Sequence, residues 1–129
     1  MSANLEQVAT LFVQYYYNQF DQDRSGLNTL YREGSMLTFE SSSYKGTGTI
    51  IEKLQSLPFQ VIKHQVATMD PQPGVAPDHI MVLVTGQLLV DEEQRPMSYT
   101  QSFYLVPENI NGQTQYYVHN DIFKLVYLG

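Results

Sequence analysis

The chain has 129 residues, a length that favours a single domain over residues 1–129 with a core of its own. Its formal charge is −6, from 13 acidic and 7 basic residues, which argues against a nucleic-acid backbone or an anionic membrane surface as the main partner. There is no cysteine, so the sequence excludes a disulfide framework and a thiolate metal site.

The beginning of the sequence, MSANLEQVAT, lacks the basic start and uninterrupted apolar segment of a signal peptide. No stretch approaches the length of a transmembrane helix. We therefore expect a soluble intracellular protein that does not insert into membranes. Its ten tyrosines and six phenylalanines are residues that fill cores and also line pockets and interfaces.

The first part of the chain predicts three helices and one strand. Residues 3–20 carry apolar side chains at spacings of three and four, the pattern of an amphipathic helix, and DQDRSG ends this pattern. LNTLYREG, residues 27–34, predicts a short second helix closed by Gly34. SMLTFES, residues 35–41, predicts a strand. The third helix is expected over residues 47–57, because a Gly/Thr turn precedes it and Pro58 follows.

After Pro58 the apolar residues recur with a period of two. This pattern predicts four long strands over residues 59–71, 79–90, 97–107 and 114–128, separated by breaks rich in Pro, Gly or Asn. The order of elements indicates an α+β domain with helices packed on one face of a strongly bent, mostly antiparallel sheet. Such a sheet leaves a cone-shaped cavity at its open end, with strand ends and hairpin tips at the rim.

Metal and phosphate chemistry is not expected. The histidines, His64, His79 and His119, are isolated in sequence and lie on different strands, so none has the short spacing of a metal motif. YKGTGTI has two glycines before a helix but lacks the lysine placement of a phosphate loop. We therefore expect neither a metal nor a cofactor.

Acid–base catalysis stays open as an alternative. A buried carboxylate beside a tyrosine in a cone-shaped cavity can isomerise or dehydrate small apolar molecules. The candidates are Glu40, Asp91, Asp121 and the tyrosines. However, Asp91 and Glu93 flank a hairpin tip, where water keeps carboxylates ionised, and no His–Asp pair is spaced along one strand face.

The stretch LLVDEEQRPM can be a solvated turn or an acidic rim beside an apolar cavity. Asp91 and Glu93 alternate around Glu92, so on an extended hairpin end they point the same way, and Glu92 is expected to matter least. In LTFE, Glu40 can be an exposed strand-end acid or part of the same rim.

Four long segments resemble the nuclear transport factor 2 family, and in particular its fungal members. They are YYYNQFDQDRSGLNTLYREGSMLTFE, IIEKLQSLPFQVIKHQ, VTGQLLVDEEQRPM and NDIFKL, and the resemblance runs from about Leu5 to Leu125. It implies a cone-shaped α+β domain, of the cystatin-like kind, that forms a homodimer with the sheets packed face to face.

The resemblance also implies a non-enzymatic carrier found in cytoplasm and nucleus and enriched at the nuclear pore. Such a carrier binds the GTPase Ran in its GDP form and touches phenylalanine–glycine repeats of nucleoporins. A third reading, a dimeric scaffold that binds nucleoporin-type or export-factor partners without Ran, stays open.

Residue roles follow from the same resemblance. Acidic residues on the rim would pair with basic residues of Ran, and an aromatic side chain of Ran would enter the cavity. Leu5 would contact nucleoporin repeats, and His64 would lie in the dimer interface. The matching rim acids are Glu40, Asp91 and Glu93, and the matching cavity residues are Phe39, Leu57, Ile62, Met97, Ile122 and Phe123.

The chain departs from the family pattern at three of these positions. Glu93 stands where aspartate is common, Phe39 where many members have tryptophan, and Leu5 where an aromatic residue is usual. The smaller ring of Phe39 would leave a roomier cavity. The change at Leu5 bears on the strength of the nucleoporin contact.

Overall fold

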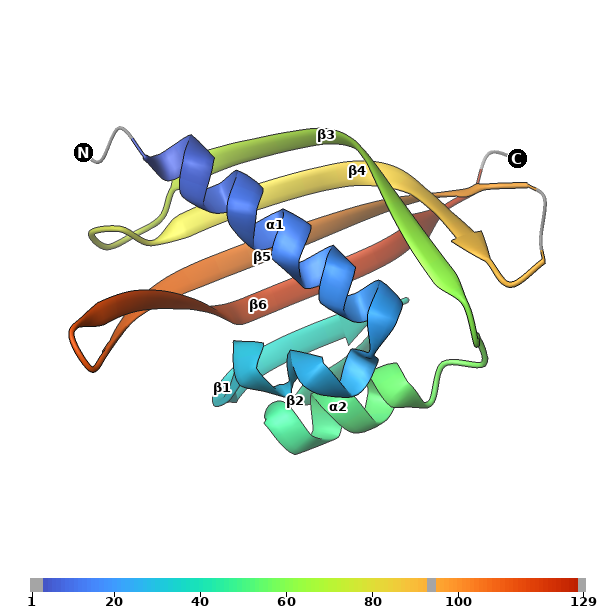
Figure 1. Cartoon of the computed structure of the whole chain (residues 1–129), viewed down its shortest axis with the longest axis horizontal. Helices are drawn as coiled ribbons and strands as arrows, with labels where there is room; N and C mark the ends of the chain where they lie inside the picture. Colours follow the sequence, from blue (N-terminus) through green and yellow to red (C-terminus); the bar gives the residue numbers. More distant parts are fainter. Residues whose placement is uncertain (1–3, 93–94, 128–129) are drawn as a thin grey trace.

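The computed structural model describes residues 4–92 and 95–127. Figure 1 shows α1 lying diagonally across one face of four long strands, with η1 and α2 beside β1 and β2. The elements in chain order are α1 (Leu5–Gln22), η1 (Arg24–Leu30), β1 (Tyr31–Phe39), β2 (Ser42–Lys45), α2 (Thr47–Gln55), β3 (Ile62–Pro73), β4 (Ile80–Val90), β5 (Met97–Ile110) and β6 (Gln113–Val126).

Helix α1 forms where the apolar period predicted it. Its buried stripe is Ala9, Phe12, Val13, Tyr16, Tyr17 and Phe20. The helix ends at Gln22. The next residue, Asp23, has an extended backbone, and its carboxylate accepts a hydrogen bond from the Ser25 N–H at 3.0 Å. This cap begins η1 directly after α1.

The second predicted helix is partly wrong. Residues 24–30 form a 3₁₀ helix with Leu27 and Leu30 buried, but Tyr31 already belongs to β1 and pairs with Val118. A spacing of three suits the 3₁₀ turn, in which residues i and i+3 lie above one another. The buried Tyr31 is held by tertiary packing in the sheet, which overrides its place in the helix-like pattern.

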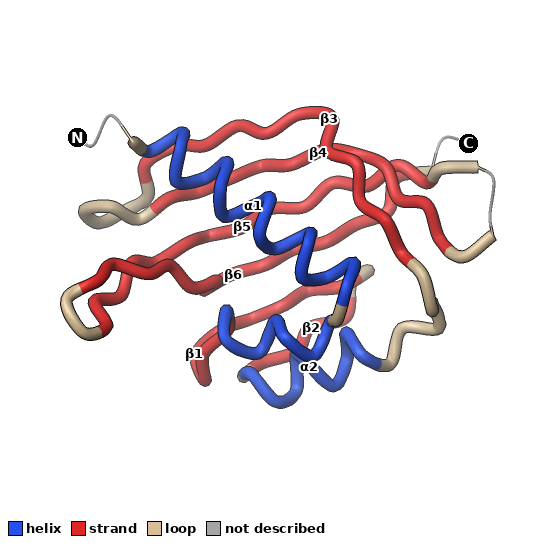
Figure 2. The backbone as a smooth tube through the Cα atoms, viewed as in Figure 1, coloured by secondary structure: helices blue, strands red, loops and turns tan. Residues whose placement is uncertain are grey.

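The described residues form one six-stranded sheet in the order β2-β1-β6-β5-β4-β3. β1 and β6 run parallel, and the other paired strands run antiparallel. Figure 2 shows β3 and β4 bending together as they approach their shared end. β2 was not predicted. It is a short Ser-rich strand that folds back on β1 because Glu40 and Ser41 both adopt positive φ, 51° and 76°.

Residues alternate strictly between the two faces of β4. Ile80, Val82, Val84, Leu88 and Val90 are buried on the inner face, whereas Met81, Leu83 and Leu89 are exposed on the outer face. The pairing of β3 with β4 shifts register between Val66 and Thr68, the kind of bulge that bends a strand. Gly86 lies beside this bulge, where a Cβ atom would come within 2.3 Å of the Gln65 carbonyl oxygen. The bend therefore needs glycine at this position.

One apolar core lies between α1, α2 and the inner face of the sheet. None of the helices in the described residues is long and apolar enough to cross a membrane.

Candidate functional site

A pocket of about 200 Å³ with an apolar lining opens at the end of the sheet where β1 ends and where β3 and β5 begin. We call it the apolar pocket. Strands β1, β3, β4, β5 and β6 all contribute to it, and residues 57–59 close one side. Its lining residues are Phe20, Phe39, Leu57, Pro58, Phe59, Ile62, His64, Leu88, Met97, Phe123 and Leu125.

The structure brings together the predicted cavity residues with one exception. Phe39, Leu57, Ile62, Met97 and Phe123 all line the apolar pocket. Ile122 does not, because neighbouring residues on a strand point to opposite faces and Phe123 points inward. The Ile122 side chain is 53% exposed on the outer face of the sheet.

Several lining residues were missed by sequence reasoning. Leu88 and Leu125 could have been found by parity, because they share faces with Val90 and Phe123 on the same strands. Phe20 and Phe59 come from a helix end and a loop. No apolar periodicity in the sequence indicates that such residues reach the pocket.

Stacked rings form one wall of the apolar pocket. Phe39 and Phe123 stack with centroids 4.8 Å apart and planes 8° apart, and Phe123 stacks in turn on Tyr99 at 5.6 Å. The Lys53 ammonium lies 5.4 Å from the Phe39 centroid and 5.5 Å from that of Tyr44. The wall therefore has a cation at one end, a favourable arrangement for aromatic faces.

His64 does not lie on the outer face, where a contact between packed sheets would need it. Its side chain is only 2% exposed and stacks on the Tyr17 ring at 4.2 Å. The Asp21 carboxylate accepts the His64 backbone N–H at 2.9 Å and lies 2.6 Å from Nδ1. This His–Asp pair joins α1 to β3, which is why a search along single strands missed it. His64 is thus part of the pocket floor.

The rim acid Glu40 lies on the β1 and β6 side of the pocket. Its carboxylate accepts the Leu125 N–H at 3.3 Å and lies 3.8 Å from the Lys124 ammonium. The side chain is 30% exposed. Because Phe39 and Leu125 line the pocket, this contact keeps a carboxylate beside its mouth.

The rim acid Asp91 lies on the opposite side, where β4 ends. Its Oδ1 accepts the N–H groups of Gln60 at 3.0 Å and Val61 at 2.8 Å, and its φ of 51° turns the chain sharply. Glu92 is exposed next to it. Glu93, the third predicted rim acid, lies outside the described residues.

A buried carboxylate exists, but it is not in the apolar pocket. Asp121 is 1% exposed, and its oxygens accept hydrogen bonds from Gln101 Nε2 at 2.7 Å and the Tyr31 hydroxyl at 2.7 Å. Tyr16 and Tyr17 complete this group, which we call the aspartate–tyrosine cluster. Burial raises the pKa of Asp121 to about 6, and these hydrogen bonds oppose the rise. An enclosed carboxylate with satisfied oxygens offers no base to a molecule in the pocket.

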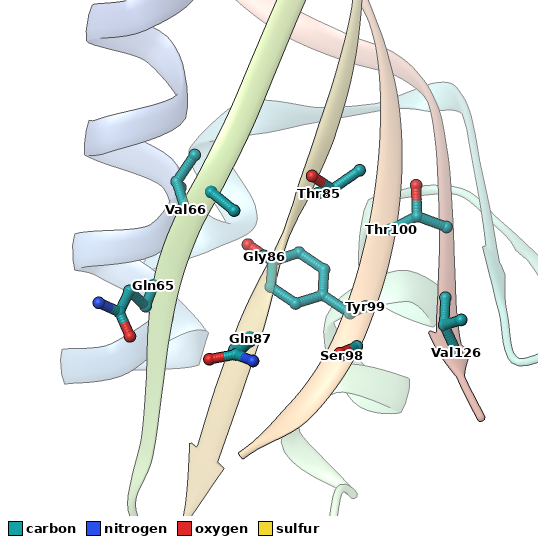
Figure 3. Close-up of a pocket in the computed structure, with 10 residues that line it drawn as sticks. Gln65, Val66, Thr85, Gly86, Gln87, Ser98, Tyr99, Thr100 and Val126 are labelled. Carbon is teal, nitrogen blue, oxygen red and sulfur yellow. The ribbon is translucent and has the colours of Figure 1, made fainter. Parts of the chain in front are cut away.

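The outer face of the sheet has a wide, shallow hollow of about 580 Å³. Figure 3 shows Thr85, Gln87, Ser98, Thr100 and Val126 along its strands. Exposed apolar side chains lie on the same outer face, Leu83 and Ile122 each opposite Ser102 in the strand register. This face is covered by none of the described helices (Figure 1).

Leu5 is the first residue of α1, and the start of α1 lies toward the opposite end of the sheet from the ends of β1 and β4 (Figure 1). It is partly buried against the core and lines a small recess of about 40 Å³ together with Val8, His79 and Tyr116. Within the described part of the chain, no group of three His, Cys, Asp or Glu side chains could hold a metal ion.

Known proteins resemble this chain over nearly its whole length. The family described as "Nuclear transport factor 2 (NTF2) domain" matches residues 8–125. Proteins named "Nuclear transport factor 2" from Candida albicans and Saccharomyces cerevisiae are 54% and 50% identical, covering 98% of this chain and 99% and 98% of theirs. The structure of nuclear transport factor 2 from Cryptosporidium parvum superposes with a TM-score of 0.88 at 32% identity, covering 98% of each chain.

Fold and site together define a cone-shaped α+β domain of the cystatin-like class, with an apolar pocket in its open end. This confirms the fold class expected from the sequence. The chain belongs to the nuclear transport factor 2 family. Its role is in nuclear transport, and its relatives carry the name of a transport factor rather than of an enzyme.

Proposed function

We propose that the protein is a non-enzymatic carrier that binds Ran in its GDP form through the apolar pocket and its acidic rim. The observation that carries this proposal is an apolar pocket of about 200 Å³ with carboxylates on two opposite sides, Glu40 and Asp91. Apolar cavities of about 150 Å³ are known to hold a benzene ring. An aromatic side chain of Ran is therefore of the right size for the pocket.

The pocket and the rim have different energetic roles. Burying an aromatic side chain is worth roughly 2–3 kcal/mol from its apolar area. Exposed ion pairs contribute at most about 1 kcal/mol each, but they select a basic partner and speed the encounter. The aromatic side chain would anchor the complex, and Glu40, Asp91 and Glu93 would select the partner.

Substitution of the rim acids tests the proposal. Glu40→Lys and Asp91→Asn are each expected to weaken binding to Ran-GDP several-fold in a titration, because each removes one rim ion pair, and Glu92→Gln serves as the matched control. Sedimentation velocity would check that each variant keeps the oligomeric state of the parent protein. Unchanged affinity in both rim variants would contradict the proposal.

A second part of the proposal is homodimerisation through the outer face of the sheet. It is supported by uncovered apolar side chains on that face, Met81, Leu83, Ile122 and Val126. Ile122, which was expected in the cavity, is thus assigned to the proposed dimer interface. His64, which was expected in that interface, is not part of it. Ile122→Glu is expected to give monomers in sedimentation velocity, whereas Asn120→Glu, at the next outer position, tests whether charge alone has that effect.

A third part of the proposal is contact with nucleoporin phenylalanine–glycine repeats at Leu5, which would let the carrier pass the nuclear pore. The recess beside Leu5 has Val8 and Ile80 in its lining, an apolar surface against which the edge of a phenylalanine ring would pack. A pull-down with Ran loaded with GDP or GTP separates the carrier from a dimeric scaffold that works without Ran. Retention of the GDP form alone supports the carrier, and retention of neither form supports the scaffold.

A further inference from the structure

Residues 57–61 form a wall of the apolar pocket that has no regular structure of its own. The segment joins the end of α2 to the start of β3, and Leu57, Pro58 and Phe59 line the pocket. Backbone in a helix or strand is fixed by its own ladder of hydrogen bonds. Here the position of the wall has to be set by contacts with other elements.

The first of these contacts comes from η1. Arg24 donates from Nη2 to the Phe59 carbonyl oxygen at 2.7 Å, and its guanidinium carbon lies 5.9 Å from the centre of the Phe20 ring. The Arg24 Nη1 atom is buried and has no hydrogen-bond partner among the described residues. A partly buried guanidinium is costly, so a strong bond to the Phe59 carbonyl is the main compensation that this geometry provides.

The second contact comes from the rim. Asp91 Oδ1 accepts the N–H groups of both Gln60 and Val61, and the Asp91 N–H donates to the Val61 carbonyl oxygen at 2.7 Å. All of these bonds use one carboxylate oxygen and the backbone. Oδ2 accepts no hydrogen bond from the described residues and is left for a donor from outside.

We propose that Arg24 and Asp91 are positioning residues that hold residues 57–61 in place as the wall of the apolar pocket. Asp91 thereby has two roles on two atoms, Oδ1 for the wall and Oδ2 for a basic partner. Arg24 acts only through the wall. The effect on the partner rests on the proposed function, whereas the effect on the pocket does not.

Two substitutions at Asp91 separate its roles. Asn keeps a carbonyl oxygen for the Gln60 and Val61 N–H groups and removes the charge. Gly removes the side chain and tolerates the positive φ of 51°, so the loss is not confused with backbone strain.

Arg24→Met removes the bond to Phe59 without changing any acid. Glu92→Ala and Lys63→Met are matched controls at exposed neighbours.

Amide hydrogen exchange and an NMR titration with toluene measure the wall and the pocket directly. In Asp91→Gly the Gln60 and Val61 amides are expected to exchange at least tenfold faster, since each loses an acceptor. Toluene affinity is expected to fall about tenfold in Asp91→Gly and Arg24→Met, and to stay within twofold of the parent value in Asp91→Asn and both controls. Parent-like exchange and toluene affinity in Asp91→Gly and Arg24→Met would overturn the proposal.

Binding of Ran-GDP then tests the link to the partner. Arg24→Met is expected to weaken it about tenfold although every rim acid remains, and parent-like affinity in this variant would overturn the link. If the parent protein itself does not bind Ran-GDP, the proposed function fails. The toluene and exchange results would still decide the role of the two positioning residues.

Discussion

The inner face of β5 and β6 carries two regions of opposite character only a few residues apart. The aspartate–tyrosine cluster uses Gln101 and Asp121 and is sealed beneath α1. The apolar pocket uses Met97 and Phe123 of the same strands and is open to solvent at the sheet end. The sealed region is polar with satisfied hydrogen bonds, and the open region is apolar with empty space.

The difference follows from what covers each region. Tyr16 and Tyr17 on α1 reach down to Asp121 and Gln101, so a polar group there is paired on every side. Beyond the end of α1, the irregular wall at residues 57–61 covers the part of the sheet that forms the apolar pocket. A fold of this kind is held together where it is polar and sealed, and it can bind where it is apolar and incompletely covered.

Removing the central acid of the sealed region should have the largest effect. Asp121→Ala leaves Gln101 and the Tyr31 hydroxyl without their buried acceptor, so we expect a loss of about 4 kcal/mol in the free energy of unfolding. Urea unfolding followed by circular dichroism measures this. Met97→Ala, at the partly buried edge of the pocket, should cost under about 1.5 kcal/mol. Similar losses in both variants would erase the contrast.

The sealed region should also make stability depend on pH. Because the folded pKa of Asp121 is raised from 3.8 to about 6, the folded protein binds more protons than the unfolded chain between these values. Its contribution is complete below the unfolded pKa and is lost as the pH rises through about 6. At about 1.4 kcal/mol per pKa unit, the loss between pH 4 and pH 7 is about 2 kcal/mol, because part of the contribution is already lost at pH 4.

The comparison with Asp121→Asn isolates this contribution. The variant keeps the shape of the side chain. The Gln101 amide can turn so that its oxygen accepts from the new Asn amide, and its nitrogen then donates to the Tyr17 hydroxyl, which can accept as well as donate. We expect the parent protein to lose about 2 kcal/mol relative to Asp121→Asn over that pH range. Parallel urea-derived stability curves for the two proteins would refute a raised pKa at Asp121.

The sequence predicted the regular parts of the fold for a physical reason. The α1 stripe and the alternation in β4 are periodic, and periodicity is local. β2 was missed because its Ser-rich run has no apolar alternation and depends on the turn at Glu40. Tyr31 was misassigned because its strand conformation depends on β6, far away in sequence.

The candidate site divides in the same way. The predicted cavity residues on strands follow parity, and Ile122 fails because it has the wrong parity next to Phe123. The role of Asp91 in holding the wall could not be predicted, since it joins residues 60 and 61 to a hairpin end through side-chain geometry. The His64–Asp21 pair was missed because its two members lie on different elements.

Placing the same side chain in the apolar pocket and in the tightly packed core beneath α1 sharpens the contrast further. Leu88→Phe places a larger ring in the empty space of the apolar pocket, so we expect little change in stability and at least a tenfold loss of toluene affinity by NMR titration. Val82→Phe, on the same strand but fully buried beneath α1, has no such space and should cost about 3 kcal/mol. Equal destabilisation by the two would mean that the pocket has no room.

The smallest expected effect concerns the cation at the end of the pocket wall. Lys53→Met keeps the methylene packing but removes the ammonium from Phe39 and Tyr44, so the loss should be about 0.5–1 kcal/mol in urea unfolding. Lys45→Met, an exposed position on β2, is the matched control and should change stability by less than about 0.3 kcal/mol. An equal effect of both substitutions would assign the change to net charge. Only a loss confined to Lys53→Met identifies the ammonium as a support of the aromatic wall, weak beside the hydrogen bonds of Asp121.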